Sequence, residues 1–222
     1  MKKFRFVFAG IFAILIVVTI TGFMLTKNSA HIDITYITKT CTIQNEINKT
    51  DIIIEYPFFT APEGININQL NELVYKQSVK TQLEKYDNKT GLYYKGKYSI
   101  KLLDKEYASI LFESESYLDG SAYPVDNGFG LTYNVKKNKT EDLYEIIEKS
   151  NLDKIIDAKN FKVVKAVNDF LTDPAFEYYM HVDSSSGFYL TDDSFGLIFS
   201  LPHVAGDYAT VETHVSKNLK LK

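Results

Sequence analysis

The sequence predicts an α+β fold, with a largely antiparallel mixed sheet and about three helices, preceded by one N-terminal transmembrane helix. Three observations lead to this prediction. An uncharged stretch of twenty residues lies near the start of the chain. After it, segments in which apolar and polar residues alternate outnumber segments with a 3.6-residue apolar repeat. The two kinds of segment are mixed and do not alternate strictly, which favours α+β.

The uncharged stretch, Phe6–Leu25, is long enough as a helix to cross the roughly 30 Å hydrocarbon core of a bilayer. Three basic residues precede it and only Lys27 follows closely, so the positive-inside bias places the N-terminus in the cytoplasm. The alternative is a cleaved signal peptide and a secreted protein, although the candidate cleavage site Asn28-Ser29-Ala30 has a poor first residue. We expect a single-pass cell-membrane protein with a cytoplasmic stub at 1–5, an anchor at 6–25, a linker at 26–31 and an extracytoplasmic domain at 32–222.

The extracytoplasmic part is acidic and contains no arginine. The whole chain carries a net charge of −3, and the four basic residues within 1–30 contribute +4, so the remainder carries −7. Arg5 is the only arginine of the chain. Such a domain is poorly suited to nucleic acid or to bidentate phosphate binding, and we expect no nucleic-acid partner. Cys41 is the only cysteine; the alternation around it predicts a buried strand residue, and the alternative is a bridge to a partner chain.

The first half of the domain predicts strands around one long helix. The helix covers residues 67–86, where apolar residues recur near every 3.6 positions, and Asn66 or Asn68 is its N-cap. Pro57 ends the strand before it. Alternating apolar and polar residues predict strands at 32–43, 47–56, 98–103, 107–117 and 128–135.

The second half predicts two helices and three strands. Thr140-Glu141-Asp142-Leu143 approaches a capping box with two acids in the first turn, and this helix extends to Lys149. Phe161–Leu171 has an amphipathic helical repeat that Pro174 ends. A loop at 183–187 follows. The remaining strands are 188–190 and 195–201, which form a hairpin, and 208–215, whose alternation predicts one buried face that includes Val211.

No residue pattern predicts a catalytic or a metal centre. The four histidines are spread along the chain, none pairs with another at i, i+4, and Cys41 is alone, so we expect no metal and no cofactor. The serines at 184–186 lack the G-x-S-x-G context of a hydrolase. Glu113 and Glu115 share one strand face and can flank a glycan, although a solvated face explains them more simply.

Two groups of residues carry a resemblance to a known family. The first is Tyr117-Leu-Asp-Gly120-Ser-Ala-Tyr123-Pro124 with residues 130–135 and the Thr140 helix start; the second is Gly187-Phe-Tyr-Leu-Thr-Asp-Asp193 with Leu197-Ile-Phe-Ser and His203-Val-Ala-Gly206-Asp-Tyr-Ala-Thr-Val211. Over most of residues 33–215 their order and spacing resemble the extracytoplasmic domain shared by the peptidoglycan deacetylase PdaC and the anti-sigma factor RsiV. The resemblance implies a bacterial, membrane-tethered, mixed α/β module, which in RsiV recognises lysozyme.

The resemblance is confined to this module. PdaC carries a separate deacetylase domain after it, and RsiV a cytoplasmic sigma-binding segment before its membrane helix, so neither deacetylation nor sigma-factor control is expected here. The family often has Gly-Gly-Ala-His-Pro where this chain has Gly120-Ser-Ala-Tyr123-Pro124, so Tyr123 replaces the histidine.

We expect a membrane-anchored extracytoplasmic binding module that recognises a cell-wall component, such as cell-wall glycan, or a lysozyme-like wall-acting protein. The alternative is an enzyme or enzyme accessory acting on cell-wall glycan, with Glu113, Asp119 and Asp126 near one groove. Recognition residues concentrate on loops held by a rigid sheet, and tyrosine offers a large apolar area with a polar tip. Tyr123 can alternatively pack on the core beside Pro124. The expected ligand-binding residues are Tyr117, Asp119, Tyr123, Asp126 and Phe129.

Overall fold

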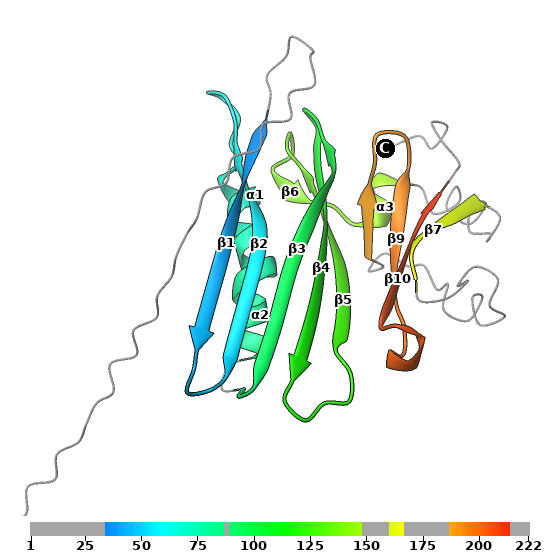
Figure 1. Cartoon of the computed structure of the whole chain (residues 1–222). Helices are drawn as coiled ribbons and strands as arrows, with labels where there is room; N and C mark the ends of the chain where they lie inside the picture. Colours follow the sequence, from blue (N-terminus) through cyan, green and yellow to red (C-terminus); the bar gives the residue numbers. More distant parts are fainter. Residues whose placement is uncertain (1–33, 87–88, 148–159, 167–186, 214–222) are drawn as a thin grey trace, which may run out of the picture.

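Two sheets, one long helical segment and two short helical turns make up the described part of the chain (Figure 1). The computed structural model describes residues 34–86, 89–147, 160–166 and 187–213. Strands are mostly antiparallel and helices are few, which confirms the predicted α+β class. The expected transmembrane segment at 6–25 lies outside the described residues. Within the part that the structure describes, no helix is both long and apolar enough to cross a membrane.

The first sheet has six strands that are adjacent in the order in which they occur along the chain. All neighbours are antiparallel except β2 and β3, which are parallel. A parallel pair cannot be joined by a tight turn and needs a crossover connection, which the long helical segment supplies. The strands are β1 (Thr35–Asn45), β2 (Thr50–Thr60), β3 (Leu92–Leu103), β4 (Tyr107–Leu118), β5 (Val125–Asn134) and β6 (Lys139–Thr140).

The crossover is helical from Asn68 to Lys85, which confirms the predicted helix at 67–86. It consists of α1 (Asn68–Tyr75), a π-helical turn (Lys76–Lys80) and α2 (Thr81–Lys85). The N-cap position of α1 is Ile67, so the prediction of Asn66 or Asn68 as the N-cap is wrong. Asn66 precedes this position, and its Oδ1 accepts a hydrogen bond from the backbone N–H of Asn68 at 3.1 Å. Asn71 fixes α1 to β2, because its side-chain amide both donates to and accepts from the backbone of Phe59, at 2.9 and 2.8 Å.

The second sheet has four antiparallel strands in the order β7-β10-β9-β8. They are β7 (Phe161–Lys165), β8 (Gly187–Leu190), β9 (Phe195–Ser200) and β10 (Tyr208–Thr213), with a 3-10 turn, η4 (His203–Ala205), between β9 and β10. The hairpin predicted from 188–190 and 195–201 is confirmed as β8 and β9.

The helix predicted at Phe161–Leu171 is wrong over its first five residues, which form β7. Phe161 pairs with Thr213 and Val163 with Val211, so β10 satisfies the backbone of this segment. Val163 and Val164 are 38% and 43% exposed, so the apolar repeat does not mark a buried helix face. Consecutive β-branched side chains fit a strand better than a helix. Residues 167–171 lie outside the described part.

Several other predicted boundaries differ from the structure. Pro57 does not end β2, which continues to Thr60, because β2 pairs only with β1 beyond Ile54 and Pro57 can occupy such an edge position. β5 begins at Val125 and not at residue 128. β3 begins at Leu92 and not at residue 98, because its buried face includes Gly96, which carries no apolar side chain to show the alternation. Thr140 lies in β6, and α3 (Leu143–Ile146) begins after Asp142, whose backbone N–H donates to Glu145 Oε2 at 2.9 Å. α3 ends at Ile146, because the backbone of Ile147 is extended, so the predicted continuation of this helix to Lys149 is wrong at Ile147. Residues 148–149 lie outside the described part.

The core has two main parts that meet between the sheets. One lies between the first sheet and the crossover helices and includes Ile54, Leu70 and Ile110. The other lies on the second sheet and includes α3. They meet where β4 and β5 face the second sheet, and there the Ser109 hydroxyl accepts a hydrogen bond from the backbone N–H of Leu190 at 2.8 Å. The residues at this junction are Leu111, Tyr189, Ile198 and Tyr208.

Candidate functional site

The loop between β4 and β5 and the η4 turn lie at the same end of the two sheets (Figure 1). Both carry exposed aromatic or apolar side chains. Tyr123, in the loop between β4 and β5, is 68% exposed, and Val204, in η4, is 94% exposed. The ring of Tyr123 lies 6.1 Å from the ring of His203, between centroids and at an interplanar angle of 49°. We call Tyr123, His203 and Val204 the loop surface. It combines an aromatic ring, an imidazole and an aliphatic side chain that contact solvent.

Asp207 fastens this loop surface to the first sheet. It has a positive φ of 66°, which is uncommon for a residue other than glycine. Its Oδ1 lies 2.8 Å from Nδ1 of His203, and its Oδ2 accepts a hydrogen bond from the backbone N–H of Asp126, also at 2.8 Å. The unusual backbone of Asp207 therefore holds one carboxylate between the η4 turn and the start of β5.

A cluster of ion pairs lies next to this fastening point, at the junction of the two sheets. Lys165 of β7 donates from Nζ to the Tyr208 hydroxyl at 2.5 Å and to Asp126 Oδ2 at 3.3 Å. It also lies 3.5 Å from Glu113 Oε1, while Lys97 Nζ lies 3.6 Å from Glu113 Oε2. The Tyr208 hydroxyl donates to Glu113 Oε1 at 2.8 Å. Residues from β3, β4, β5, β7 and β10 thus share one hydrogen-bonded network.

The protonation states in this network follow from burial and charge. Burial alone would raise the pKa of Glu113, but the hydrogen bond from Tyr208 and the ammonium groups of Lys97 and Lys165 outweigh it and lower the pKa below its ordinary value. Burial, followed by the hydrogen bond and charge of Glu113, raises the pKa of Tyr208 well above its ordinary value. Glu113 is therefore ionised and Tyr208 neutral at pH 7.

The residues predicted to bind ligand lie in different surroundings. Tyr123 is on the loop surface, and Asp126 lies beside it in the ion-pair cluster. Tyr117 is the second-last residue of β4 and pairs with Tyr93 of β3, and these two residues are 36% and 37% exposed.

Asp119 and Phe129 are placed elsewhere. The carboxylate of Asp119 is exposed and lies 3.9 Å from Lys49 Nζ, while its backbone N–H donates to the Gly91 carbonyl. Phe129 is half-buried and its ring stacks on Phe112 with centroids 4.8 Å apart. Of the three carboxylates proposed to share a groove, Glu113 and Asp126 are brought together by Lys165, and Asp119 is paired separately.

Sequence reasoning did not single out His203, Asp207, Lys165 or Tyr208 as site residues. Lys165 lies in the segment predicted as a helix at 161–171, and His203 lies between the strands predicted at 195–201 and 208–215. The sequence signal for this turn is Gly206 followed by Asp207. Both residues have a positive φ, which glycine adopts readily. In the part of the chain that the structure describes, no group of three or more histidine, cysteine, aspartate or glutamate side chains can hold a metal ion.

Comparisons with known proteins give the fold and nothing finer. No family model matches the chain, and no curated protein matches it. A solved structure of a DUF3298 family protein from Pseudomonas aeruginosa PAO1 aligns with 82% of this chain and 90% of its own, at 11% identity and a TM-score of 0.53. The chain shares the fold of that protein. A member of the same family from Bacteroides fragilis aligns with 86% of this chain and 92% of its own, at 13% identity and a TM-score of 0.47.

Proposed function

We propose that the chain is a membrane-anchored extracytoplasmic binding module whose loop surface recognises a cell-wall component or a wall-acting protein such as lysozyme. The observation that carries the proposal is the exposure of Tyr123 and Val204 on two loops that are fastened at their base. Exposed aromatic side chains on a preorganised support are typical of recognition surfaces. The motif resemblance to the PdaC/RsiV-like module supports the same class of partner.

The direction of the first strand fits an anchored module. β1 begins at Thr35, which pairs with Thr60, at the end of the sheet opposite the β4–β5 loop (Figure 1). The other end of β1 leads into a turn that includes Asn48. The Asn48 carbonyl accepts a hydrogen bond from the backbone N–H of Gly91, and the Gly91 carbonyl accepts one from the backbone N–H of Asp119, which follows β4. An anchor that precedes β1 would therefore leave the loop surface pointing away from the membrane, where wall components and extracellular proteins are accessible.

The test compares two exposed tyrosines in the full chain, purified in detergent micelles. Tyr123→Ala should weaken capture of lysozyme or of purified peptidoglycan by about tenfold, or about 1.4 kcal/mol. Its melting temperature should stay near that of the parent protein, because a ring that is 68% exposed contributes little to the core. The control, Tyr75→Ala on α1, removes a ring that is 47% exposed and should leave capture unchanged.

Two results would contradict the proposal. If Tyr123→Ala and the parent chain captured lysozyme and peptidoglycan equally well, the loop surface would not be the binding site. Turnover of peptidoglycan by the purified chain would favour the alternative, an enzyme acting on wall glycan.

A further inference from the structure

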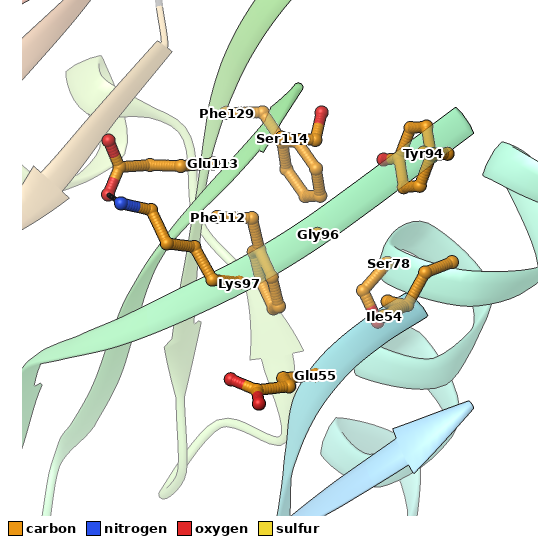
Figure 2. A pocket seen from close by; sticks show the side chains of 10 residues that line it. All are labelled: Ile54, Glu55, Ser78, Tyr94, Gly96, Lys97, Phe112, Glu113, Ser114 and Phe129. Carbon is orange, nitrogen blue, oxygen red and sulfur yellow. Dashed lines mark ion pairs between the residues drawn. The ribbon is translucent and has the colours of Figure 1, made fainter. Parts of the chain in front are cut away.

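One side of the first sheet is exposed near the end that carries the loop surface. β3 alternates strictly over residues 92–97, where every second residue is buried on the side of the helical crossover and the residues between them are exposed. Figure 2 shows both sides: Tyr94 lies toward Ser78 of the crossover, and Lys97 points the other way and pairs with Glu113. The exposed side continues on β4. Two successive cross-strand pairs form the surface that we call the outer face, Tyr93 with Tyr117 and Lys95 with Glu115.

The two tyrosines of the outer face differ from the other tyrosines of the first sheet. Of the tyrosines in its six strands, all of which the structure describes, only Tyr93 and Tyr117 are exposed. They lie directly opposite each other in the antiparallel ladder. Their side chains therefore project from the same side of the sheet, with Cβ atoms about 4.5–5.5 Å apart. Because both remain in contact with solvent, packing in the core does not account for their position.

Charged groups of both signs surround the two tyrosines. Lys95 and Glu115 are opposite each other on the neighbouring pair, and Asp51 of β2 lies opposite one of the tyrosines. At the end of these strands Lys49 Nζ lies 3.9 Å from Asp119 Oδ2, and these side chains are 78% and 62% exposed. Ammonium groups donate hydrogen bonds and carboxylates accept them. A surface that offers both, with little net charge, suits a neutral ligand rich in hydroxyl groups.

We propose that the outer face binds a neutral glycan, with sugar rings on Tyr93 and Tyr117 and sugar hydroxyls on Lys95, Glu115 and Asp51. The C–H side of a sugar ring is apolar and packs on an aromatic ring, while the hydroxyls at its edge need donors and acceptors. A protein partner fits less well, because the centre of a protein interface is depleted of charged residues and here charged side chains adjoin both tyrosines. The proposal is independent of the loop surface, and Tyr123 takes no part in it.

The experiment titrates soluble glycans into the full chain and follows binding by saturation-transfer NMR. The micelles consist of a detergent without a sugar headgroup, which would compete for the site. The probes are the tetramer of N-acetylglucosamine, cellotetraose and, as an anionic comparison, tetragalacturonate. At least one neutral tetrasaccharide should show saturation of its ring protons, and tetragalacturonate should bind more weakly. Preference for the N-acetylated tetramer would indicate wall-type glycan as the source of the ligand, and preference for cellotetraose an unmodified glucan.

Four variants locate the site. Tyr93→Ala and Tyr117→Ala should each weaken binding of the neutral tetrasaccharide by about tenfold, because each removes one aromatic surface. Tyr75→Ala is the matched control, because Tyr75 is an exposed tyrosine of α1, on the other side of the sheet, and contacts Tyr56 there. This control and Tyr123→Ala should leave tetrasaccharide binding unchanged.

The assignment would be overturned if no neutral tetrasaccharide bound, if both outer-face variants bound as the parent chain does, or if Tyr75→Ala lost as much binding as they do. Should either tyrosine variant fail to fold, Lys95→Met decides the question, because it removes only the ammonium of an exposed side chain and should still weaken binding. Failure of this test leaves the loop surface unaffected, since capture there is measured with Tyr123→Ala.

Discussion

Replacing Gly130 with alanine should force β5 away from β8, where the two sheets are in contact. A Cβ at position 130 would overlap the carbonyl oxygen of Phe188 and lie 2.8 Å from its carbonyl carbon. The obstacle is the backbone of β8, which cannot rotate away as a side chain can. Overpacking a core costs about 1–3 kcal/mol, and we expect the upper end of this range. In a protein of this size each kcal/mol lowers the melting temperature by about 2–4 °C, so Gly130→Ala should melt about 6–12 °C below the parent chain.

Gly96→Ala is the matched control for this experiment. Both glycines lie inside strands of the first sheet, and neither has a positive φ. The loss of backbone freedom in the unfolded chain is therefore the same for both and cancels in the comparison. At position 96 the nearest atoms would be 3.3 Å away and belong to side chains. Thermal melting should place Gly130→Ala clearly below Gly96→Ala. Equal melting temperatures would show that β5 and β8 do not approach as described.

Three further predictions concern the core, the ion-pair cluster and the membrane. Val211→Asp should lower the free energy of unfolding by several kcal/mol, because Val211 is fully buried and the new carboxylate would have no partner; an unchanged melting temperature would contradict this. Because the pKa of Glu113 is lowered in the folded chain, its contribution is present above the pKa of the unfolded state and is lost as the pH falls through the folded value. The gap in melting temperature between the parent chain and Glu113→Gln should thus narrow on acidification, and a constant gap would refute the assignment. The mature protein should keep residues 1–30 and stay in the membrane fraction; N-terminal sequencing that begins near His31, with release into the medium, would show cleavage.

The local pattern of apolar and polar residues was sufficient to predict the elements whose two faces differ in polarity. The helical crossover was predicted almost to its ends, because one side of it packs on the sheet and the other meets solvent. β4 was predicted for the same reason over its second half, where Glu113, Glu115 and Tyr117 lie on the more exposed face. The pattern failed at Phe161, because pairing with β10 overrides a weak helical repeat.

The candidate site could be predicted only in part. Tyr123 and Asp126 follow from turn chemistry after a clear strand. Their partners His203, Asp207, Lys165 and Tyr208 come from the second sheet, and no local spacing relates residue 126 to residue 207. The alternation at 208–215 predicted one buried face, and Val211 is buried as expected. Tyr208 and Thr210, on the other face, are buried as well, so the prediction of a single buried face is wrong over Tyr208–Val211. No local pattern identifies the element that covers the second face.

The arrangement of the loop surface therefore depends on how the two sheets stack. Asp207 reaches the backbone of Asp126 only because β10 lies against the start of β5. Lys165 pairs with both carboxylates and Lys97 pairs with Glu113, so attraction to two ammonium groups offsets the repulsion between Glu113 and Asp126. The rings of the loop surface then project from a base fixed by charge and by hydrogen bonds. The loop surface would thus meet a partner in a shape already set, which lowers the entropy lost on binding.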